Sequence, residues 1–167
     1  MRRAQRGDGG AVEELFVAYW PMCHRAAWLI ARDATAAEDI AQEAFVAAIA
    51  ALDRFDRSRR LGPWLRTIVA RRAIDHTRAR VARREVDAEA LGRIAAPESG
   101  PRGASDDLVA ALGLLSLDRR VVVVLRFFLD MTPREIAGLL DLPVGTVNSR
   151  MRRALDELRA SSEAHDG

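Results

Sequence analysis

Residues 132–153 read TPREIAGLLDLPVGTVNSRMRR, an order of residue types that is typical of two short helices joined by a tight turn. Thr132 and Glu135 stand three residues apart, as in a capping box, and Pro133 takes the favoured first helical position. Asp141 stands at the turn, where Asp tolerates a left-handed backbone better than most residues. The apolar side chains spaced to pack between the helices are Ile136, Ala137, Leu140, Leu142 and Val147. The stretch therefore predicts a helix-turn-helix.

The second of these helices has two contrasting faces. Steps of three and four residues predict that one face is buried, and it holds Val144, Val147, Met151, Leu155 and Leu158. The opposite face holds Asn148, Ser149, Arg152 and Arg153, whose side chains suit base edges and phosphates. Thr146 and the free amides at the helix start suit a phosphate. The spacing alone fits both a DNA-binding helix and an ordinary helical hairpin with a solvated polar face.

The residues before this motif predict a second, smaller helical domain and a linker. Leu108, Leu112 and Leu115 indicate a helix, and the apolar run 121–129 indicates the buried centre of the domain. Four consecutive valines also favour a strand, but the sequence offers no second strand to pair with it, so we expect a helix. Periodicity fades from residue 81, and Pro, Gly and Ser gather, so we expect a flexible linker over 82–106 between domains 1–81 and 107–167.

The first half of the chain reads as a helical bundle, so we expect an all-α protein of two small domains. Apolar repeats over 12–30 predict two helices, or one helix kinked at Pro21. Thr35 and Glu38 predict a capping box that starts the next helix. That helix directs inward Ile40, Ala41, Ala44, Phe45, Ala48, Ile49 and Leu52. A loop over 53–63 and a helix over 63–80 follow, with Pro63 in its first turn.

Arginines are concentrated in the first domain. All 26 basic residues of the chain are arginine, which fits either a GC-rich coding sequence or a preference for phosphate and guanine contacts. Residues 57–84 hold ten arginines against one acid, Asp75, a charge pattern that supports phosphate binding. Phe55 and Trp64 flank the loop and fit either core packing or stacking on an unpaired base. Arg71 and Asp75 are spaced to pair within the helix.

Other classes of function find little support. The single cysteine, Cys23, excludes an internal disulfide and reads as a small buried hydrophobe, which fits a cytoplasmic protein. No apolar run approaches the roughly 18 residues of a membrane span, so we expect no membrane insertion. The sequence shows no Gly-rich phosphate loop, metal-ligand set or catalytic triad. We therefore expect no enzyme activity, metal or cofactor.

Three ordered stretches resemble the extracytoplasmic-function sigma factors of the sigma-70 family. Residues 37–45, AEDIAQEAF, resemble that family's polymerase-docking signature. Residues 52–56, LDRFD, with WL at 64–65 and AIDHTR at 73–78, resemble the segment that recognises and melts the minus-ten element. Residues 134–137, REIA, with GTVNSR at 145–150, resemble the fourth sigma domain, which reads the minus-thirty-five element.

The resemblance implies a promoter-specific initiation factor whose partners are core RNA polymerase, promoter DNA and an anti-sigma factor. It implies polymerase contacts, on the clamp helices of the large subunit, for Glu38, Asp39, Gln42 and Glu43. It implies minus-ten contacts for Phe55, Arg57, Arg59, Arg60, Trp64, Arg66, Arg71, Arg72, Asp75 and Arg78. It implies minus-thirty-five contacts for Arg134, Thr146, Asn148, Ser149, Arg150, Arg152 and Arg153.

Some positions depart from the family pattern, and one rival interpretation stays open. Arg71 stands where asparagine is usual, Ile49 where tryptophan is common, and Ser116 with Leu117 replaces Leu-Pro. These departures concern promoter sequence and docking rather than class. The rival is a stand-alone helix-turn-helix regulator that binds duplex DNA as a dimer, which would leave the acidic face of residues 38–43 without a role.

Overall fold

The structure is a computed structural model that describes the backbone of residues 1–91 and 106–163, with side chains for 1–83 and 109–161. Every element within these ranges is helical, which confirms the all-α prediction. The chain divides into two compact units, unit 1 (Met1–Ala95) and unit 2 (Ala96–Gly167). None of the described helices is long and apolar enough to cross a membrane.

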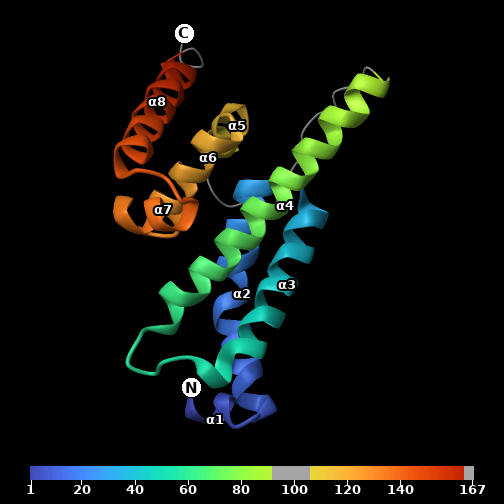
Figure 1. The fold of residues 1–167 in the computed structure, drawn as a ribbon, viewed down its shortest axis with the longest axis vertical. Helices are drawn as coiled ribbons and strands as arrows, with labels where there is room; N and C mark the ends of the chain where they lie inside the picture. Colours follow the sequence, from blue (N-terminus) through green and yellow to red (C-terminus); the bar gives the residue numbers. More distant parts are fainter. Residues whose placement is uncertain (92–105, 164–167) are drawn as a thin grey trace. The chain divides into compact units, whose positions relative to one another are not determined.

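Unit 1 is a bundle of three long helices closed at one end by a short one (Figure 1). Its elements are α1 (Arg2–Gln5), α2 (Gly9–Ala31), α3 (Ala34–Ala51), the 3₁₀ turn η1 (Leu52–Arg54) and α4 (Leu61–Leu91). Each pair of α2, α3 and α4 is in contact. Small side chains allow this close approach, and those buried along α3 are Ala36, Ala37, Ala41, Ala44 and Ala48.

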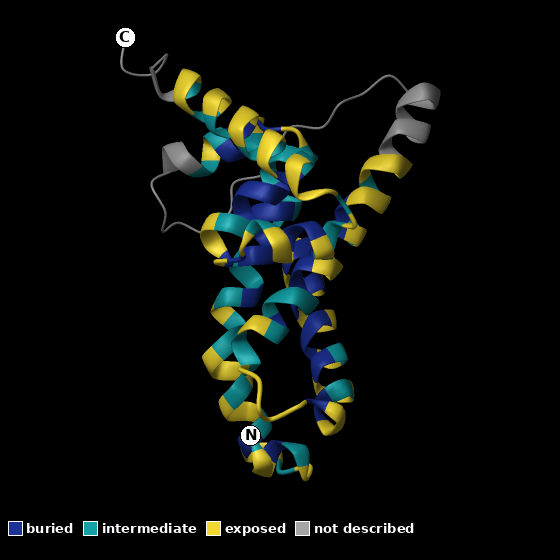
Figure 2. Cartoon of the chain, turned by 60° about the vertical axis from the view of Figure 1, so that its left-hand side comes forward, coloured by how far each residue is buried: buried dark blue, intermediate teal, exposed yellow. Residues whose placement is uncertain are grey.

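The core of unit 1 is largely apolar. Ile30, Ile40 and Val69, one from each long helix, are at most 1% exposed, and Figure 2 shows the buried stripe along the bundle. Cys23 is fully buried, and this burial raises the pKa of its thiol to about 12. The thiol therefore stays protonated at neutral pH, which confirms that Cys23 serves as a small hydrophobe.

The predicted start of the second long helix of unit 1 is wrong. α3 begins at Ala34 and its N-cap is Asp33 instead of Thr35, because the carboxylate of Asp33 accepts a hydrogen bond from the Ala36 amide at 2.8 Å. Arg32, at φ 57°, provides the left-handed turn that ends α2. α2 itself is one continuous helix that contains Pro21, which settles the alternative left open by the sequence.

α4 also differs from its predicted length. It continues to Leu91 instead of ending near Arg80, whose guanidinium pairs with Asp33 at the turn before α3. This ion pair, and the helix-favouring Arg, Ala and Glu residues that follow, explain the extension. The first part of the predicted linker, 82–91, is therefore helical, while residues 92–105 of that linker lie outside the described residues.

Unit 2 contains the shorter helices. They are α5 (Asp106–Leu114), α6 (Leu117–Val123), the π-helical turn η2 (Val124–Phe128), α7 (Pro133–Leu140) and α8 (Val144–Glu163). Residues 121–125 are buried in a helical conformation, so the prediction of a helix over a strand is confirmed. The amide of Leu129 donates to the carbonyl of Val124 at 3.0 Å and closes this wider turn, in which Phe127 is 62% exposed.

Leu125 is fully buried in the core of unit 2, so we expect its truncation to reduce stability strongly. Leu125→Ala should lower the free energy of unfolding of unit 2 by about 2–5 kcal/mol, because the lost contacts leave a cavity. Leu114→Ala is the matched control, since Leu114 is 78% exposed. Chemical denaturation of the full chain measures both variants, and equal losses of stability would contradict this description of the core.

Candidate functional site

The predicted helix-turn-helix is confirmed in its local geometry. The Glu135 amide donates to the Thr132 hydroxyl at 3.3 Å, and the Thr132 amide donates to the Glu135 carboxylate at 2.7 Å, so both halves of the capping box are present. Asp141 adopts a left-handed conformation with φ 54° and ends α7. The following Leu142 amide donates to the Ala137 carbonyl at 3.0 Å, which fixes the turn between α7 and α8.

α8 presents a polar face to solvent. Val147 and Ala154 are fully buried on the inner side, and Ile136 of α7 is fully buried as well. Val144, which the spacing predicted as buried, is 39% exposed because it lies in the first turn of α8. The opposite side, which we call the recognition face, carries four exposed residues: Asn148, Ser149, Arg152 and Arg153.

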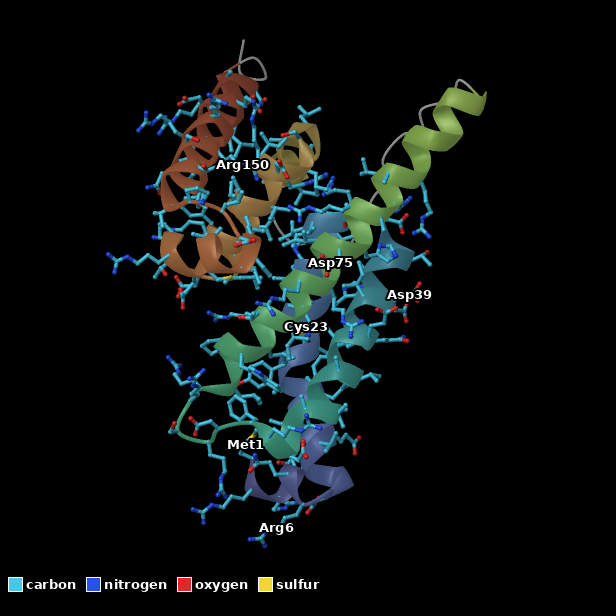
Figure 3. The ribbon with its side chains drawn as sticks, in the orientation of Figure 1. Met1, Arg6, Cys23, Asp39, Asp75 and Arg150 are labelled. Carbon is cyan, nitrogen blue, oxygen red and sulfur yellow. The ribbon has the colours of Figure 1, made fainter. Side chains whose placement is uncertain are left out.

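The remaining residues predicted for the minus-thirty-five element lie in other environments. Arg150 places a guanidinium nitrogen 2.8 Å from the Asp118 carboxylate and so ties α8 to α6 (Figure 3). Thr146 is half-buried, and its carbonyl accepts a hydrogen bond from the Ser149 hydroxyl at 3.0 Å. Arg134 is exposed in the first turn of α7. The structure thus separates Arg150, which has a partner within the unit, from the recognition face.

In unit 1, α3 and α4 border a groove of about 500 Å³. We call this the docking groove, and its lining residues are Asp39, Gln42, Glu43, Val46, Ala47, Ala50, Arg72 and His76. Glu38, Asp39, Gln42 and Glu43 are all exposed, and Figure 3 shows Asp39 on the outer side of α3. Arg72 and Glu43, predicted to contact different partners, form an ion pair of 3.2 Å across the groove.

Sequence reasoning missed two exposed apolar side chains of α3, of which Val46 lines the docking groove. Val46 is 67% exposed and Ile49 is 46% exposed, although Ile49 was expected to point inward. Ile49 lies at the edge of the contact between α2 and α3, where only part of its side chain is covered. Extending the helical period from Asp39 by two turns would have predicted that Val46 lies on the same side of α3.

His76, which also lines the docking groove, has its Nδ1 atom buried with no hydrogen-bond partner among the described residues.

The aromatic residues beside the loop pack together. The rings of Phe55 and Trp64 lie 4.7 Å apart, and Phe55 is only 8% exposed. Trp64 is half-buried and packs against the cluster that contains Leu52. The core interpretation of Trp64 is therefore favoured, and the ring of Phe55 is not open to an unpaired base in this structure.

The arginines predicted for the minus-ten element remain accessible. Residues 55–60, which we call the basic loop, are ordered by Asp56, whose carboxylate accepts bonds from the Ser58 amide and hydroxyl at 2.9 and 2.7 Å. These bonds hold the pKa of Asp56 below its usual value. The exposed predicted residues of the loop and α4 are Arg57, Arg59, Arg60, Arg71, Arg72, Asp75 and Arg78, and Arg66 is half-buried. The described ion pairs include none between Arg71 and Asp75.

No group of three or more His, Cys, Asp or Glu residues within the described part of the chain is arranged to hold a metal ion. The exposed charged residues described above form an acidic surface along α3 and basic surfaces on the loop, α4 and α8.

Comparison with known proteins assigns both units to one family. Residues 15–83 match Sigma-70 region 2, and residues 105–158 match Sigma-70, region 4. The RNA polymerase sigma-H factor of Pseudomonas aeruginosa is 34% identical over 95% of this chain and 89% of its own length. The ECF RNA polymerase sigma-E factor of Escherichia coli is 32% identical over 95% of this chain and 90% of its own.

Solved structures agree with this assignment. CnrH, solved in complex with the cytosolic domain of CnrY, is 29% identical, with a TM-score of 0.66, over 98% of this chain and 94% of that one. The sigma factor RpoE of Bartonella quintana, solved with the anti-sigma factor NepR, is 21% identical and shares the fold, with a TM-score of 0.72 over 90% of this chain and 96% of its own. The chain belongs to the extracytoplasmic-function sigma factors of RNA polymerase, within the sigma-70 family.

Proposed function

We propose that α8 reads the minus-thirty-five element by placing its recognition face in the major groove. The observation that carries this assignment is the exposure of Asn148, Ser149, Arg152 and Arg153 directly opposite the buried Val147 and Ala154. Arginine pairs with guanine and asparagine with adenine through two hydrogen bonds each, so this face carries side chains that distinguish base pairs. We assign the phosphate contacts beside it to Arg134 and Thr146.

The basic loop and α4 are proposed to hold the minus-ten element as a single strand. Arg57, Arg59 and Arg60 are exposed in the loop, and Arg71 with Arg78 lies on the outer side of α4. This density of positive charge suits a DNA backbone and makes binding sensitive to salt. The ordered turn at Asp56 supports a preformed loop, because its hydrogen bonds remove conformational freedom that binding would otherwise cost.

The docking groove is proposed to bind core polymerase. Asp39, Gln42 and Glu43 offer charge and hydrogen-bond acceptors, while Val46, Ala47 and Ala50 add apolar area beside them. Such a mixture fits a specific protein interface, in which charge sets orientation and apolar contacts add affinity. Arg72 is proposed to contribute to polymerase binding as well as to DNA binding, because it forms an ion pair with Glu43 in the groove.

A regulatory partner and a cytoplasmic location are part of the same proposal. CnrH, which resembles this chain over nearly its whole length, was solved bound to the cytosolic domain of CnrY. We propose that an anti-sigma factor holds this chain inactive in a comparable complex, and that the chain acts in the cytoplasm on promoter DNA. The proposal assigns no catalytic chemistry to the chain.

Footprinting with and without core polymerase tests this function against the rival of a stand-alone regulator. The isolated chain should protect promoter DNA weakly and should gain sequence specificity when core polymerase is added. A regulator would behave differently, because it needs no polymerase to select its site. Protection of a palindromic operator by the chain alone at nanomolar concentration would support the rival.

A further inference from the structure

The N-terminal helix α1 is tied to the basic loop although it lies outside the part of the chain that matches Sigma-70 region 2. The side-chain amide of Gln5 donates two hydrogen bonds of 2.9 Å, one to the carbonyl of Leu52 and one to the carbonyl of Phe55. Both donors of this amide are therefore used to hold the turn η1, where the chain enters the loop. Contacts this distant in sequence make α1 a positioning element for the loop.

An open hollow of about 360 Å³ lies between α1 and the loop. We call it the arginine hollow, and its lining residues are Arg2, Gln5, Arg6, Asp53, Phe55, Asp56 and Arg57. Its volume is roughly ten times the ~30 Å³ that one water molecule occupies in the liquid, so it can take a group of several atoms. Figure 3 shows Arg6 at the end of unit 1 formed by α1.

The charges of the hollow leave an excess of cations. Asp53 lies 3.9 Å from Arg54, and Asp56 lies 3.8 Å from Arg59 and accepts the two bonds from Ser58. Both acids thus have partners of their own.

The three arginines of the hollow differ from their neighbour Arg3. Arg3 lies 2.9 Å from Asp8 and 3.7 Å from Glu14, and it does not line the hollow. Among the ion pairs of the described residues, none involves Arg2, Arg6 or Arg57. Three guanidinium groups without acid partners around one concave surface favour an anion with several acceptor oxygens.

We propose that the arginine hollow binds a backbone phosphate of the single-stranded DNA held by the basic loop. Arg57 belongs to the loop itself, while Arg2 and Arg6 reach the same hollow from α1. The two hydrogen bonds of Gln5 hold α1 against the start of the loop. This site extends the minus-ten interface to residues before position 15, and it rests on the proposed function of the loop.

Titration of a short fluorescein-labelled oligothymidylate with the full chain tests the proposal by fluorescence anisotropy at several salt concentrations. Arg6→Gln should weaken binding and lower the slope of log affinity against log salt by about 0.7, the value for one phosphate contact on a single strand. Arg3→Gln is the matched control, because it removes the same charge from the same helix outside the hollow. Its slope should equal that of the wild-type chain.

A loop variant, Arg59→Gln, separates this inference from the proposed function. If Arg59→Gln lowers the slope while Arg6→Gln does not, the hollow holds no phosphate and only this inference fails. If neither variant changes the slope, or the wild-type chain does not bind, both the hollow and the loop proposal fail. Because Arg3, Arg6 and Arg59 are all exposed, thermal melting should show the three variants folded, with midpoints close to that of the wild-type chain.

Discussion

Asp39→Arg is expected to abolish the association of this chain with core RNA polymerase while unit 1 stays folded. Asp39 is exposed and lines the docking groove together with Gln42 and Glu43. Reversing its charge sets a cation where the partner surface must be basic, and such a like-charge contact costs several kcal/mol. A loss of about 3 kcal/mol lowers the affinity by a factor of roughly 100.

Co-purification with core polymerase measures this effect, and Glu13→Arg is its control. Glu13 is exposed on α2 outside the docking groove, so the control carries the same change of charge on another surface. The control should bind polymerase as the wild-type chain does. If Asp39→Arg co-purifies with polymerase as well as the wild-type chain does, the docking groove does not bind polymerase.

Arg152→Ala should weaken binding of the holoenzyme to its promoter by about 1–3 kcal/mol, or roughly 5- to 150-fold, if Arg152 contacts a base edge. Arg152 is exposed on the recognition face, and its guanidinium can form two hydrogen bonds with guanine. The loss should appear on the cognate promoter and not on unrelated DNA, because only a base contact distinguishes sequences.

Arg159→Ala is the matched control for this measurement. Arg159 lies on the same helix about two turns further on, its side chain is 73% exposed, and it lies 3.4 Å from Asp156. Competition binding of holoenzyme to cognate and unrelated DNA should show little effect for this variant. An equal loss for Arg152→Ala on both DNAs would identify a phosphate contact instead, and no loss at all would contradict the orientation proposed for α8.

The helix-turn-helix could be predicted because its signals are local. The capping box at Thr132, the left-handed residue Asp141 and the apolar spacing through Val147 each depend on residues within one or two turns. The exposure of Asn148 and Arg152 followed from the same period. Where a feature is set by neighbouring residues, the pattern of residue types is sufficient to place it.

Features set by distant contacts could not be predicted. Thr35 satisfies the capping-box pattern, yet Asp33 caps α3 and also pairs with Arg80 of α4. Arg150 belongs to the same polar series as Ser149, yet Asp118 of α6 binds it within the unit. The burial of Phe55 depends on its contact with Trp64, which follows the loop. In each case the local pattern fits two roles equally well, and a contact with a residue of another element decides between them.

The acidic face of α3 illustrates a third limit. The spacing of Asp39, Gln42 and Glu43 shows that they share one side of a helix, but a solvated surface and a binding surface have the same spacing. The groove beside them is lined by apolar as well as charged side chains, and apolar surface rimmed by polar residues is typical of interaction sites, which favours binding. Only the packing of α4 against α3 creates that groove.

Run-off transcription with purified core polymerase on a library of promoters, followed by sequencing of the transcript starts, tests the account most directly. Two units that bind separate elements should produce starts downstream of a shared pair of sequences at a fixed spacing. Asp39→Arg should abolish these starts, and Arg152→Ala should weaken selection of the upstream sequence alone. Transcription no greater than that of core polymerase without the chain would contradict the central claim.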